Sequence, residues 1–394
     1  MENFEFCAPT KVIFGKGAIE SLGKEASSLE DQRAVIVYGS DRIEKNGILN
    51  KVESELDTWG IEHIRFKGVK ANPTVAHAKE GIKVAKDFGA DLLIAIGGGS
   101  AIDTAKAMAV GAVNSGDIWD VWQGKIKVSE CLDVACVLTI PAAGSEMSNS
   151  AVLTNEETGQ KIGLTTNIYR CKFAIMDPTY AQSLPKKQIA CGVVDIMMHT
   201  LDRYFAPKEM QHNHMTDAIA HGLLKIVIKW GKIAYEDPSN YEAMSEIMWA
   251  SSLSHNDLTG LGGGRDFSIH QFGHEISARY DITHGESLSA IWGTWCRYVM
   301  DKDIDRFALY AKEVWGSTKE GRDAAIEGIE KTEEFFVSLD MPIKIPQLSC
   351  GILDKATLDE LAQRCTRNGQ RKIGTFVPMD TEEVKKVYYL ANIV

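Results

Sequence analysis

The chain has 394 residues, more than one ordinary hydrophobic core accommodates, so two domains are expected. Its composition, with 44% hydrophobic and 25% charged residues, is that of a globular protein. The formal net charge of -11, with no compensating run of Lys and Arg, argues against nucleic acid or an anionic membrane as a partner.

The sequence predicts neither a membrane segment nor a disulfide framework. The first residues, Met1 to Phe4, do not begin a signal peptide, and no apolar run approaches the roughly 20 residues that a membrane helix needs. The eight cysteines are scattered along the chain and form no CxxC pair. We therefore expect reduced thiols and a cytoplasmic location.

Short apolar runs alternate with amphipathic stretches in the first half of the chain. Residues 33–40 (RAVIVYGS), 91–100 (DLLIAIGGGS) and 135–141 (ACVLTIP) are typical of buried strands, and 75–90 has apolar residues at helical spacing. Fully apolar strands separated by helices indicate a parallel sheet covered on both faces. The sequence therefore predicts a Rossmann-like α/β domain over residues 1–185.

The stretch IAIGGGSAIDTAKAMA (94–109) places three glycines and a serine between a strand and a helix. Glycines let the backbone approach a ligand closely, and the free N–H groups and dipole of a helix start attract an anion. The stretch matches neither GxGxxG nor a P-loop, and a tight turn without a ligand is the alternative. The candidates for binding the phosphates of a dinucleotide are Gly97, Gly98, Gly99 and Ser100.

The strand at 135–141 leads into a second turn of small residues, TIPAAGSEMS (139–148). The hydroxyl groups of Thr139 and Ser145 are candidates for contacts with a nicotinamide ring or a ribose. Serine and glycine also make ordinary turns, so this stretch alone does not establish a binding site.

The end of the strand at 33–40 bears on the choice of cofactor. A carboxylate directly at this position would bind the adenosine ribose 2′-OH and repel a 2′-phosphate. Here the strand ends in Gly39, which leaves space, while Ser40 and Arg42 can meet a phosphate and Asp41 opposes it. The residues favour NADP(H), with NAD(H) as the alternative.

Beyond about residue 185, long helical patterns replace the strand-like runs. A proline before a charged helix start at 183–188 marks the boundary. The sequence predicts an all-helical domain over residues 186–394. Its clearest helical patterns lie at 186–205, 214–235, 241–258 and 322–339.

Three histidines lie within fifteen positions in HQFGHEISARYDITHGE (270–286). His270 and His274 are four residues apart and share one face of a helix. On one straight helix, His284 would lie roughly 21 Å from His270 at about 1.5 Å per residue. Binding of one ion by both therefore requires a break in the helix near residues 280–285.

Asp195 and His199 are also four residues apart, on a helix that is otherwise apolar there. A carboxylate among apolar residues is costly unless it is paired or binds something. With the downstream histidines, it gives one carboxylate and three imidazoles, a set that suits one divalent ion such as Fe²⁺ or Zn²⁺. The alternative is a core histidine bonded to the backbone, which we assign to His63, His77, His212, His214, His221 and His255.

These motifs together resemble the iron-containing, group III alcohol dehydrogenases, over essentially the whole chain from about residue 4. The resemblance rests on Asp195-x₃-His199, His270-x₃-His274 and His284, with GGGSAIDTAKA, NPT (72–74), GSEMS and MDPTY (176–180). Within the family, FCAPTKVIFGKGA, YGSDRIEKNG and GDIWDVW resemble the butanol dehydrogenase and broad-range aldehyde reductase branch. The resemblance implies a dehydroquinate synthase-like fold and hydride transfer between NADP(H) and primary alcohols or aldehydes.

The resemblance also implies roles for single residues. The metal ligands would be Asp195, His199, His270 and His284. His274 would lie beside the metal and relay a proton to solvent or orient its neighbours. Tyr180 would lie near the nicotinamide. The rest of the cofactor would lie along Gly39, Ser40, Gly97, Gly98, Gly99, Ser100, Asp103, Thr139, Ser145 and Lys161.

Other functions remain open at this point. One is an NAD-dependent polyol or diol dehydrogenase on the same scaffold. Another is a synthase similar to dehydroquinate synthase, although one Asp and three His differ from the Glu and two His of that family. A third is a catalytically silent cofactor-binding protein. The run TKVIFG (10–15) is typical of an exposed strand that pairs with a second copy, so we expect a homodimer.

Overall fold

The computed structural model describes residues 2–29, 33–210 and 213–394, and the chain divides into two compact units. Cys7–Leu184 and Pro238–Ser252 form an α/β unit, whereas Met1–Phe6, Pro185–Asp237 and Leu253–Val394 form a helical unit. The expected division was 1–185 and 186–394. In the structure, residues 1–6 belong to the helical unit and residues 238–252 to the α/β unit.

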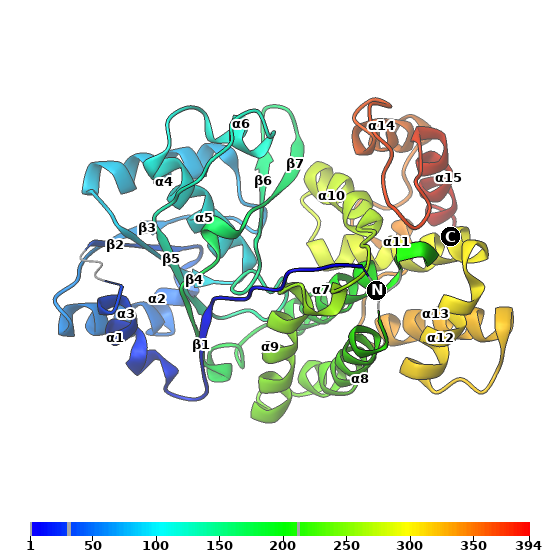
Figure 1. The fold of residues 1–394 in the computed structure, drawn as a ribbon, viewed down its shortest axis with the longest axis horizontal. Helices are drawn as coiled ribbons and strands as arrows, with labels where there is room; N and C mark the ends of the chain where they lie inside the picture. Colours follow the sequence, from blue (N-terminus) through cyan, green and yellow to red (C-terminus); the bar gives the residue numbers. More distant parts are fainter. Residues whose placement is uncertain (1, 30–32, 211–212) are drawn as a thin grey trace. The chain divides into compact units, whose positions relative to one another are not determined.

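The α/β unit is built on a six-stranded sheet in the order β1-β8-β5-β4-β2-β3, in which all neighbouring strands are parallel (Figure 1). This confirms the predicted parallel sheet. A separate antiparallel pair is formed by β6 (Ser150–Asn155) and β7 (Gln160–Thr165). The strands of the main sheet are β1 (Lys11–Phe14), β2 (Arg33–Tyr38), β3 (Glu62–Lys67), β4 (Leu92–Gly97), β5 (Asp133–Leu138) and β8 (Phe173–Met176).

Helices cover both faces of this sheet because alternate strand residues point to opposite sides. Ile36, Ile94 and Val137 pack in one fully buried cluster with α1 (Leu22–Ser27) and α3 (Ile48–Thr58). On the other face, α5 (Gly99–Val113) packs against β4 and α4 (Val75–Phe88), as Figure 1 shows. The remaining short elements of this unit are η1 (Ala18–Ser21), α2 (Asp41–Lys45), α6 (Ile118–Trp122), η2 (Asn167–Tyr169) and η3 (Pro178–Tyr180).

The helical unit is organised around α7 (Lys186–Tyr204), whose residues are buried from Ile189 to its end. It packs against α8 (His214–Glu236), α10 (Ser268–Tyr280) and α11 (His284–Val299). The helical second half is therefore confirmed. α9 (Tyr241–His255) belongs to the α/β unit up to Ser252. The further helices of the helical unit are η4 (Lys208–Met210), η5 (Leu258–Gly260), η6 (Met300–Lys302), α12 (Ile304–Trp315), α13 (Gly321–Ser338), η7 (Ile345–Gln347), α14 (Lys355–Cys365) and α15 (Thr381–Ala391).

The helical conformation is interrupted between α10 and α11, as the histidine spacing requires. α10 ends at Tyr280, Asp281 adopts a left-handed conformation with φ 51°, and α11 begins at His284. The Ser277 hydroxyl donates a hydrogen bond of 2.8 Å to the Ile282 carbonyl and ties the connection to α10. The break allows His270 and His284 to approach each other.

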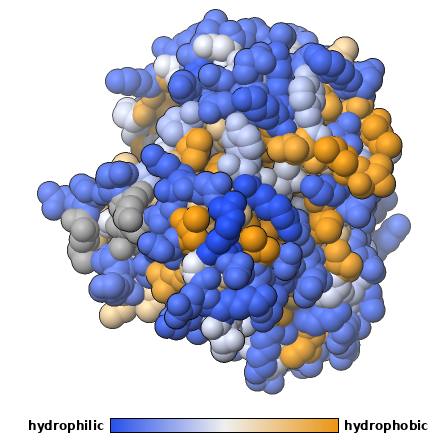
Figure 2. Space-filling model, turned by 90° about the vertical axis from the view of Figure 1, so that its right-hand side faces the viewer, coloured by the Kyte–Doolittle hydropathy of each residue, from blue (hydrophilic) through white to orange (hydrophobic). Residues whose placement is uncertain are grey.

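The face drawn in Figure 2 is mostly hydrophilic and carries hydrophobic patches. In the described parts of the chain, no helix has the length and apolar character required to cross a membrane. All eight cysteines are free.

Candidate active site

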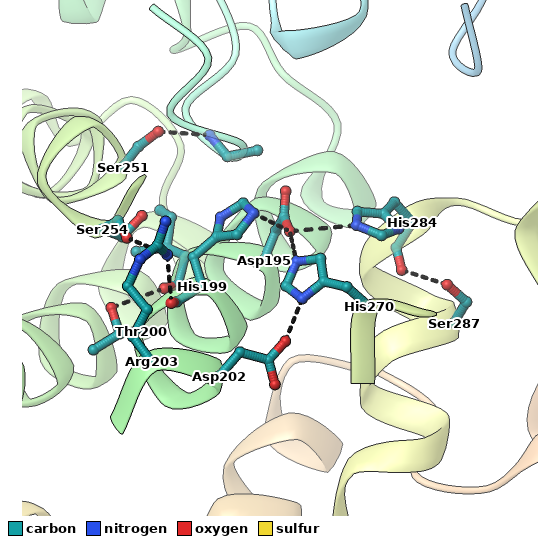
Figure 3. Close-up of polar contacts among 12 residues, drawn as sticks. Asp195, His199, Thr200, Asp202, Arg203, Ser251, Ser254, His270, His284 and Ser287 are labelled. Carbon is teal, nitrogen blue, oxygen red and sulfur yellow. Dashed lines mark hydrogen bonds and ion pairs between the residues drawn. The ribbon is translucent and has the colours of Figure 1, made fainter. Parts of the chain in front are cut away.

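Four side chains of the helical unit converge on one point (Figure 3). Asp195 and His199 lie one turn apart on α7, His270 lies in the first turn of α10, and His284 is the first residue of α11. The carboxylate of Asp195 points between the rings of the three histidines. The structure thus brings together all four residues to which the sequence assigned the metal.

The distances within this cluster exceed those of hydrogen bonds. Oδ1 of Asp195 lies 3.8 Å from Nε2 of His199 and 3.7 Å from Nε2 of both His270 and His284. Suitable ligand atoms of Asp195, His199 and His270 all lie within 4.8 Å of one another. Bonds of about 2.1 Å to a tetrahedral ion would hold its ligand atoms roughly 3.4 Å apart, so the spacing is close to that of a metal site.

The polar atoms at the centre of this cluster also lack other partners. Within the described segments, Asp195 Oδ1 and His270 Nε2 are buried and make no hydrogen bond. Leaving buried polar atoms unsatisfied is costly, and a cation at this point satisfies both. A carboxylate with imidazoles suits Fe²⁺ or Zn²⁺, so the residues fit the ion.

The cluster is open on one side. The side chains of Asp195, His199 and His270 are between 4% and 7% exposed, whereas that of His284 is 26% exposed. A catalytic metal site needs protein ligands on its buried side and access for a substrate on another. The unequal burial of these four side chains meets that requirement.

Asp202 supports His270 from behind. Its Oδ2 lies 2.5 Å from Nδ1 of His270, and the side chain is 2% exposed. Burial lowers the pKa of His270, but the nearby carboxylates of Asp195 and Asp202 outweigh it and raise the pKa to about 9. A hydrogen bond from Nδ1 to a carboxylate fixes the ring and turns Nε2 toward the ion. Sequence reasoning missed Asp202, although its position three residues after His199 was a signal.

His255 is a second residue that sequence reasoning missed. It was assigned to an ordinary core position, but its ring centroid lies 3.9 Å from that of His199, with the rings 67° apart. Burial, together with His255 and His270, holds the pKa of His199 well below its usual range, so His199 is neutral and able to bind a cation. Of the other histidines, His212 lies outside the described residues, and His221 contacts the Tyr204 hydroxyl.

His274 lies beside the cluster and is not part of its centre. Its ring centroid is 5.2 Å from that of His284 and 6.3 Å from that of His270. The ring is half-buried. This location is compatible with a role next to the ion, and that role stays a prediction.

Gly285 allows His284 to reach the cluster. A Cβ atom at Gly285 would lie 2.4 Å from the carbonyl oxygen of Cys191 and 2.7 Å from its Cα. Both are backbone atoms of α7 and cannot rotate away. Only glycine therefore permits the start of α11 to lie this close to the helix that carries Asp195.

In the α/β unit, the two glycines after β4, Gly98 and Gly99, are required for packing. A Cβ atom at Gly98 would lie 2.9 Å from Cβ of Ile140, and one at Gly99 would lie 2.9 Å from Cβ of Ala143. The glycines alone therefore do not demonstrate a ligand. However, Gly98 caps α5 without a side chain, which leaves the first N–H groups of that helix to an anion.

Several other predicted cofactor residues lie around this turn. The Ser100 hydroxyl donates to the Ala71 carbonyl at 2.5 Å, and Lys161 donates to the neighbouring Asn72 side chain at 2.9 Å. Asp103 instead accepts a 2.6 Å hydrogen bond from Ser145. Thr139 is buried next to Gly97, to whose carbonyl it donates its backbone N–H.

The end of β2 differs from what the sequence predicts. A Cβ atom at Gly39 would lie 2.7 Å from the Val69 carbonyl oxygen, so the expected space is already filled on that side. The Arg42 guanidinium donates hydrogen bonds to the Ser183 hydroxyl at 2.8 Å and to the Tyr180 carbonyl at 3.5 Å. Asp41 forms a 2.6 Å ion pair with Lys67.

Tyr180 is close to Arg42 and packs in the core that covers the α1 and α3 face of the sheet. Its hydroxyl group is buried and makes no hydrogen bond within the described part of the chain. Burial raises its pKa to about 12, so the hydroxyl keeps its proton. A buried donor without a partner is costly in free energy.

A parallel α/β unit with a glycine turn and a helical unit with an Asp and His cluster are features of metal-dependent dehydrogenases. Comparison with known protein families agrees. Residues 9–178 match the iron-containing alcohol dehydrogenase family, and residues 189–391 match the C-terminal region of the Fe-containing alcohol dehydrogenase family. The chain belongs to the iron-containing alcohol dehydrogenase family.

Similar proteins identify the branch. NADH-dependent butanol dehydrogenase A of Clostridium acetobutylicum is 39% identical over 98% of this chain and 99% of its own length. NADPH-dependent aldehyde reductase YqhD of Escherichia coli is 30% identical over the full length of both chains. The crystal structure of NADH-dependent butanol dehydrogenase A from Thermotoga maritima has a TM-score of 0.95 at 31% identity, and covers 100% of this chain and 99% of that one.

The protein is therefore an oxidoreductase of the butanol dehydrogenase and aldehyde reductase branch. Membership of the family implies a nicotinamide cofactor and a metal, iron. The resemblance inferred from the sequence is confirmed.

Replacing Gly285 with Ala tests the close approach of α11 to α7. The added methyl group overlaps the backbone of Cys191 and displaces His284. We expect a loss of unfolding free energy of about 1–3 kcal/mol and roughly tenfold weaker metal binding. Thermal unfolding and competition with a chelating dye measure the two effects. Gly222→Ala on α8 is the control, because no atom lies within 4 Å of its added Cβ. Unchanged metal binding in Gly285→Ala contradicts the argument.

Replacing Asp202 tests the support of His270. Asp202→Ala removes the acceptor of His270 Nδ1, and Asp202→Asn keeps an acceptor but removes the charge. We expect metal affinity to fall about 10- to 100-fold in the Ala variant and less in the Asn variant. Asp301→Asn, which removes an exposed carboxylate paired with Arg322, is the control. Equal metal affinities in all the variants would show that Asp202 has no such role.

Proposed function

We propose that this protein interconverts primary alcohols and aldehydes with a nicotinamide cofactor, in the manner of a butanol dehydrogenase and aldehyde reductase. In this proposal the region 1–185 binds the cofactor and the region 186–394 holds the metal. One observation carries it: Asp195 Oδ1 lies 3.7–3.8 Å from three imidazole nitrogens without a hydrogen bond in the described part of the chain. The similarity to butanol dehydrogenases and an aldehyde reductase supports the substrate class.

We assign the metal to Asp195, His199, His270 and His284. A bound divalent ion polarises an aldehyde or lowers the pKa of an alcohol, and the nicotinamide carries the hydride. Asp195 supplies the negative charge of the ligand set, and His270 is held in place by Asp202. Iron is the ion of the family, and the same ligands also suit zinc.

We assign proton transfer to His274. Its ring lies beside those of His284 and His270, and it is half-buried, so it has access to both the site and solvent. A histidine in this position can accept a proton and pass it on. Orientation of its neighbours is the second possibility.

The cofactor is assigned to the turn at the start of α5 and the residues around it. Gly97, Gly98, Gly99 and Ser100 offer the helix N-terminus to the pyrophosphate. The buried Tyr180 hydroxyl and the Lys161 ammonium supply further donors. The other residues assigned to the cofactor are Gly39, Ser40, Asp103, Thr139 and Ser145.

The geometry at the end of β2 supports NAD(H) more than the NADP(H) favoured by the sequence. Arg42 donates to Ser183 and to the Tyr180 carbonyl, so it is engaged away from Ser40. Asp41 and Glu44 surround Lys67 with two carboxylates at 2.6 and 2.9 Å. This group has a net negative charge, which disfavours a 2′-phosphate.

A homodimer in the cytoplasm is part of the proposal. β1 is an edge strand of the sheet and leaves backbone groups to a second copy. Phe14 and Trp249 are each 40% exposed, and their rings contact edge to face at 6.4 Å. An exposed aromatic pair at a sheet edge supports a contact between subunits. The eight free thiols support a reducing compartment.

The function is tested with metal-reconstituted protein. We expect oxidation of NADH or NADPH with butanal, loss of turnover on chelation, and recovery with Fe²⁺ or Zn²⁺. Asp195→Ala should lose metal and turnover while cofactor binding persists, because the two sets of residues lie in different units. His274→Ala should keep its metal but turn over more slowly, with a changed pH profile. Full activity of Asp195→Ala contradicts the metal assignment.

The cofactor preference is tested by comparing kcat/KM for NADH and NADPH. We expect the wild type to favour NADH. Asp41→Asn should shift the ratio toward NADPH by about tenfold, because the variant removes one of the two carboxylates paired with Lys67 and so lowers the negative charge that a 2′-phosphate meets. Asp57→Asn, which removes an exposed carboxylate on α3, is the control. A wild type that prefers NADPH overturns the assignment to NAD(H).

A further inference from the structure

A lysine is completely buried in the α/β unit. Lys106 lies on α5, two turns after the glycine turn, and has no exposed surface. Its ammonium donates to the carbonyl oxygens of Ser145 at 2.7 Å, Ser148 at 2.9 Å and Ser150 at 3.0 Å. It also lies 3.1 Å from the Ser145 hydroxyl and 5.4 Å above the ring of Tyr169. All of its acceptors belong to the segment 145–150.

Burying an ammonium group is expensive, and an apolar side chain would fill the same volume at lower cost. An ammonium has three protons, and here it meets four oxygens of the segment 145–150. The segment follows β5 and has no regular structure between Leu138 and Ser150. Lys106 therefore supplies the hydrogen-bond donors that this stretch of backbone does not find in a sheet or helix.

The same segment lies against the glycine turn. Ala143 Cβ is 2.9 Å from the position that a Cβ of Gly99 would occupy, and Ser145 Cβ is 4.0 Å from it. One side of the segment is therefore next to the start of α5, where we place the cofactor. The other side is bonded to Lys106, farther along the same helix.

Further contacts restrain this segment from other directions. Asp103 accepts from the Ser145 hydroxyl at 2.6 Å and from the Val152 backbone at 2.9 Å. The Ser252 hydroxyl donates to Glu146 at 2.5 Å. Asp103 and Lys106 lie about one turn apart on α5, so the helix holds the segment with an anion and a cation.

We infer that Lys106 is a positioning residue that fixes the 142–150 segment in the shape required for the nicotinamide half of the cofactor. This inference rests on the proposed cofactor site. Lys106 acts through the segment and does not touch the cofactor. Its loss should affect the nicotinamide end, whereas the N–H groups at the start of α5 remain available to the pyrophosphate.

The test compares two ligands that differ in the nicotinamide. We expect Lys106→Met to raise the Kd for NADH by roughly tenfold or more, because binding must then order the segment. The Kd for ADP-ribose, which lacks the nicotinamide, should rise less than about threefold. NADH fluorescence on the full-length, metal-loaded protein gives the first value, and displacement of NADH gives the second. Metal content should not change.

Lys79→Met is the control, because Lys79 also lies in the α/β unit but pairs with Asp117 at the surface. If Lys106→Met does not fold, Lys106→Gln retains two donors without the charge and should show a smaller effect of the same selectivity. Unchanged NADH binding in the variant overturns the inference, and so does an equal loss of NADH and ADP-ribose binding. Failure of the wild type to bind NADH refutes instead the proposed function.

Discussion

A carboxylate buried among three imidazoles is the interaction on which the helical unit depends. Asp195 lies in the buried part of α7, and its Oδ1 is surrounded at 3.7–3.8 Å by nitrogens of three helices. A charged group in such surroundings requires a counter-charge. Two features of the packing bring the histidines close to Asp195. Helix α10 ends at Tyr280, and Gly285 allows the start of α11 to pack closely against α7.

The backbone on either side of the histidines is correspondingly constrained. Asp257, Phe267 and Asp281 have φ angles of 78°, 58° and 51°. Residues other than glycine rarely adopt such backbone conformations. They lie two residues after His255, three before His270 and three before His284. The Phe267 ring lies 5.2 Å from that of His270 and 4.9 Å from the Arg203 guanidinium. The folded unit therefore tolerates backbone strain where it positions these rings.

The sequence predicted the parts of this arrangement that follow from spacing. Asp195 and His199 at i and i+4, and a break before His284, are local consequences of helix geometry. His255 and Asp202 were missed because their roles depend on which helices pack together. β3 was missed for a related reason: as an edge strand it alternates polar and apolar residues and lacks the continuous apolar run of β4.

The end of β2 shows why the residues alone do not decide the choice of cofactor. Gly39 and Arg42 suggested room and charge for a 2′-phosphate, but spatial partners decide what each residue offers. The Val69 carbonyl fills the space beside Gly39, and Ser183, far away in sequence, engages Arg42. Lys67 is held between Asp41 and Glu44. A charged side chain contributes to recognition through the net charge of the group that it forms with its neighbours. The group of Lys67, Asp41 and Glu44 has a net negative charge.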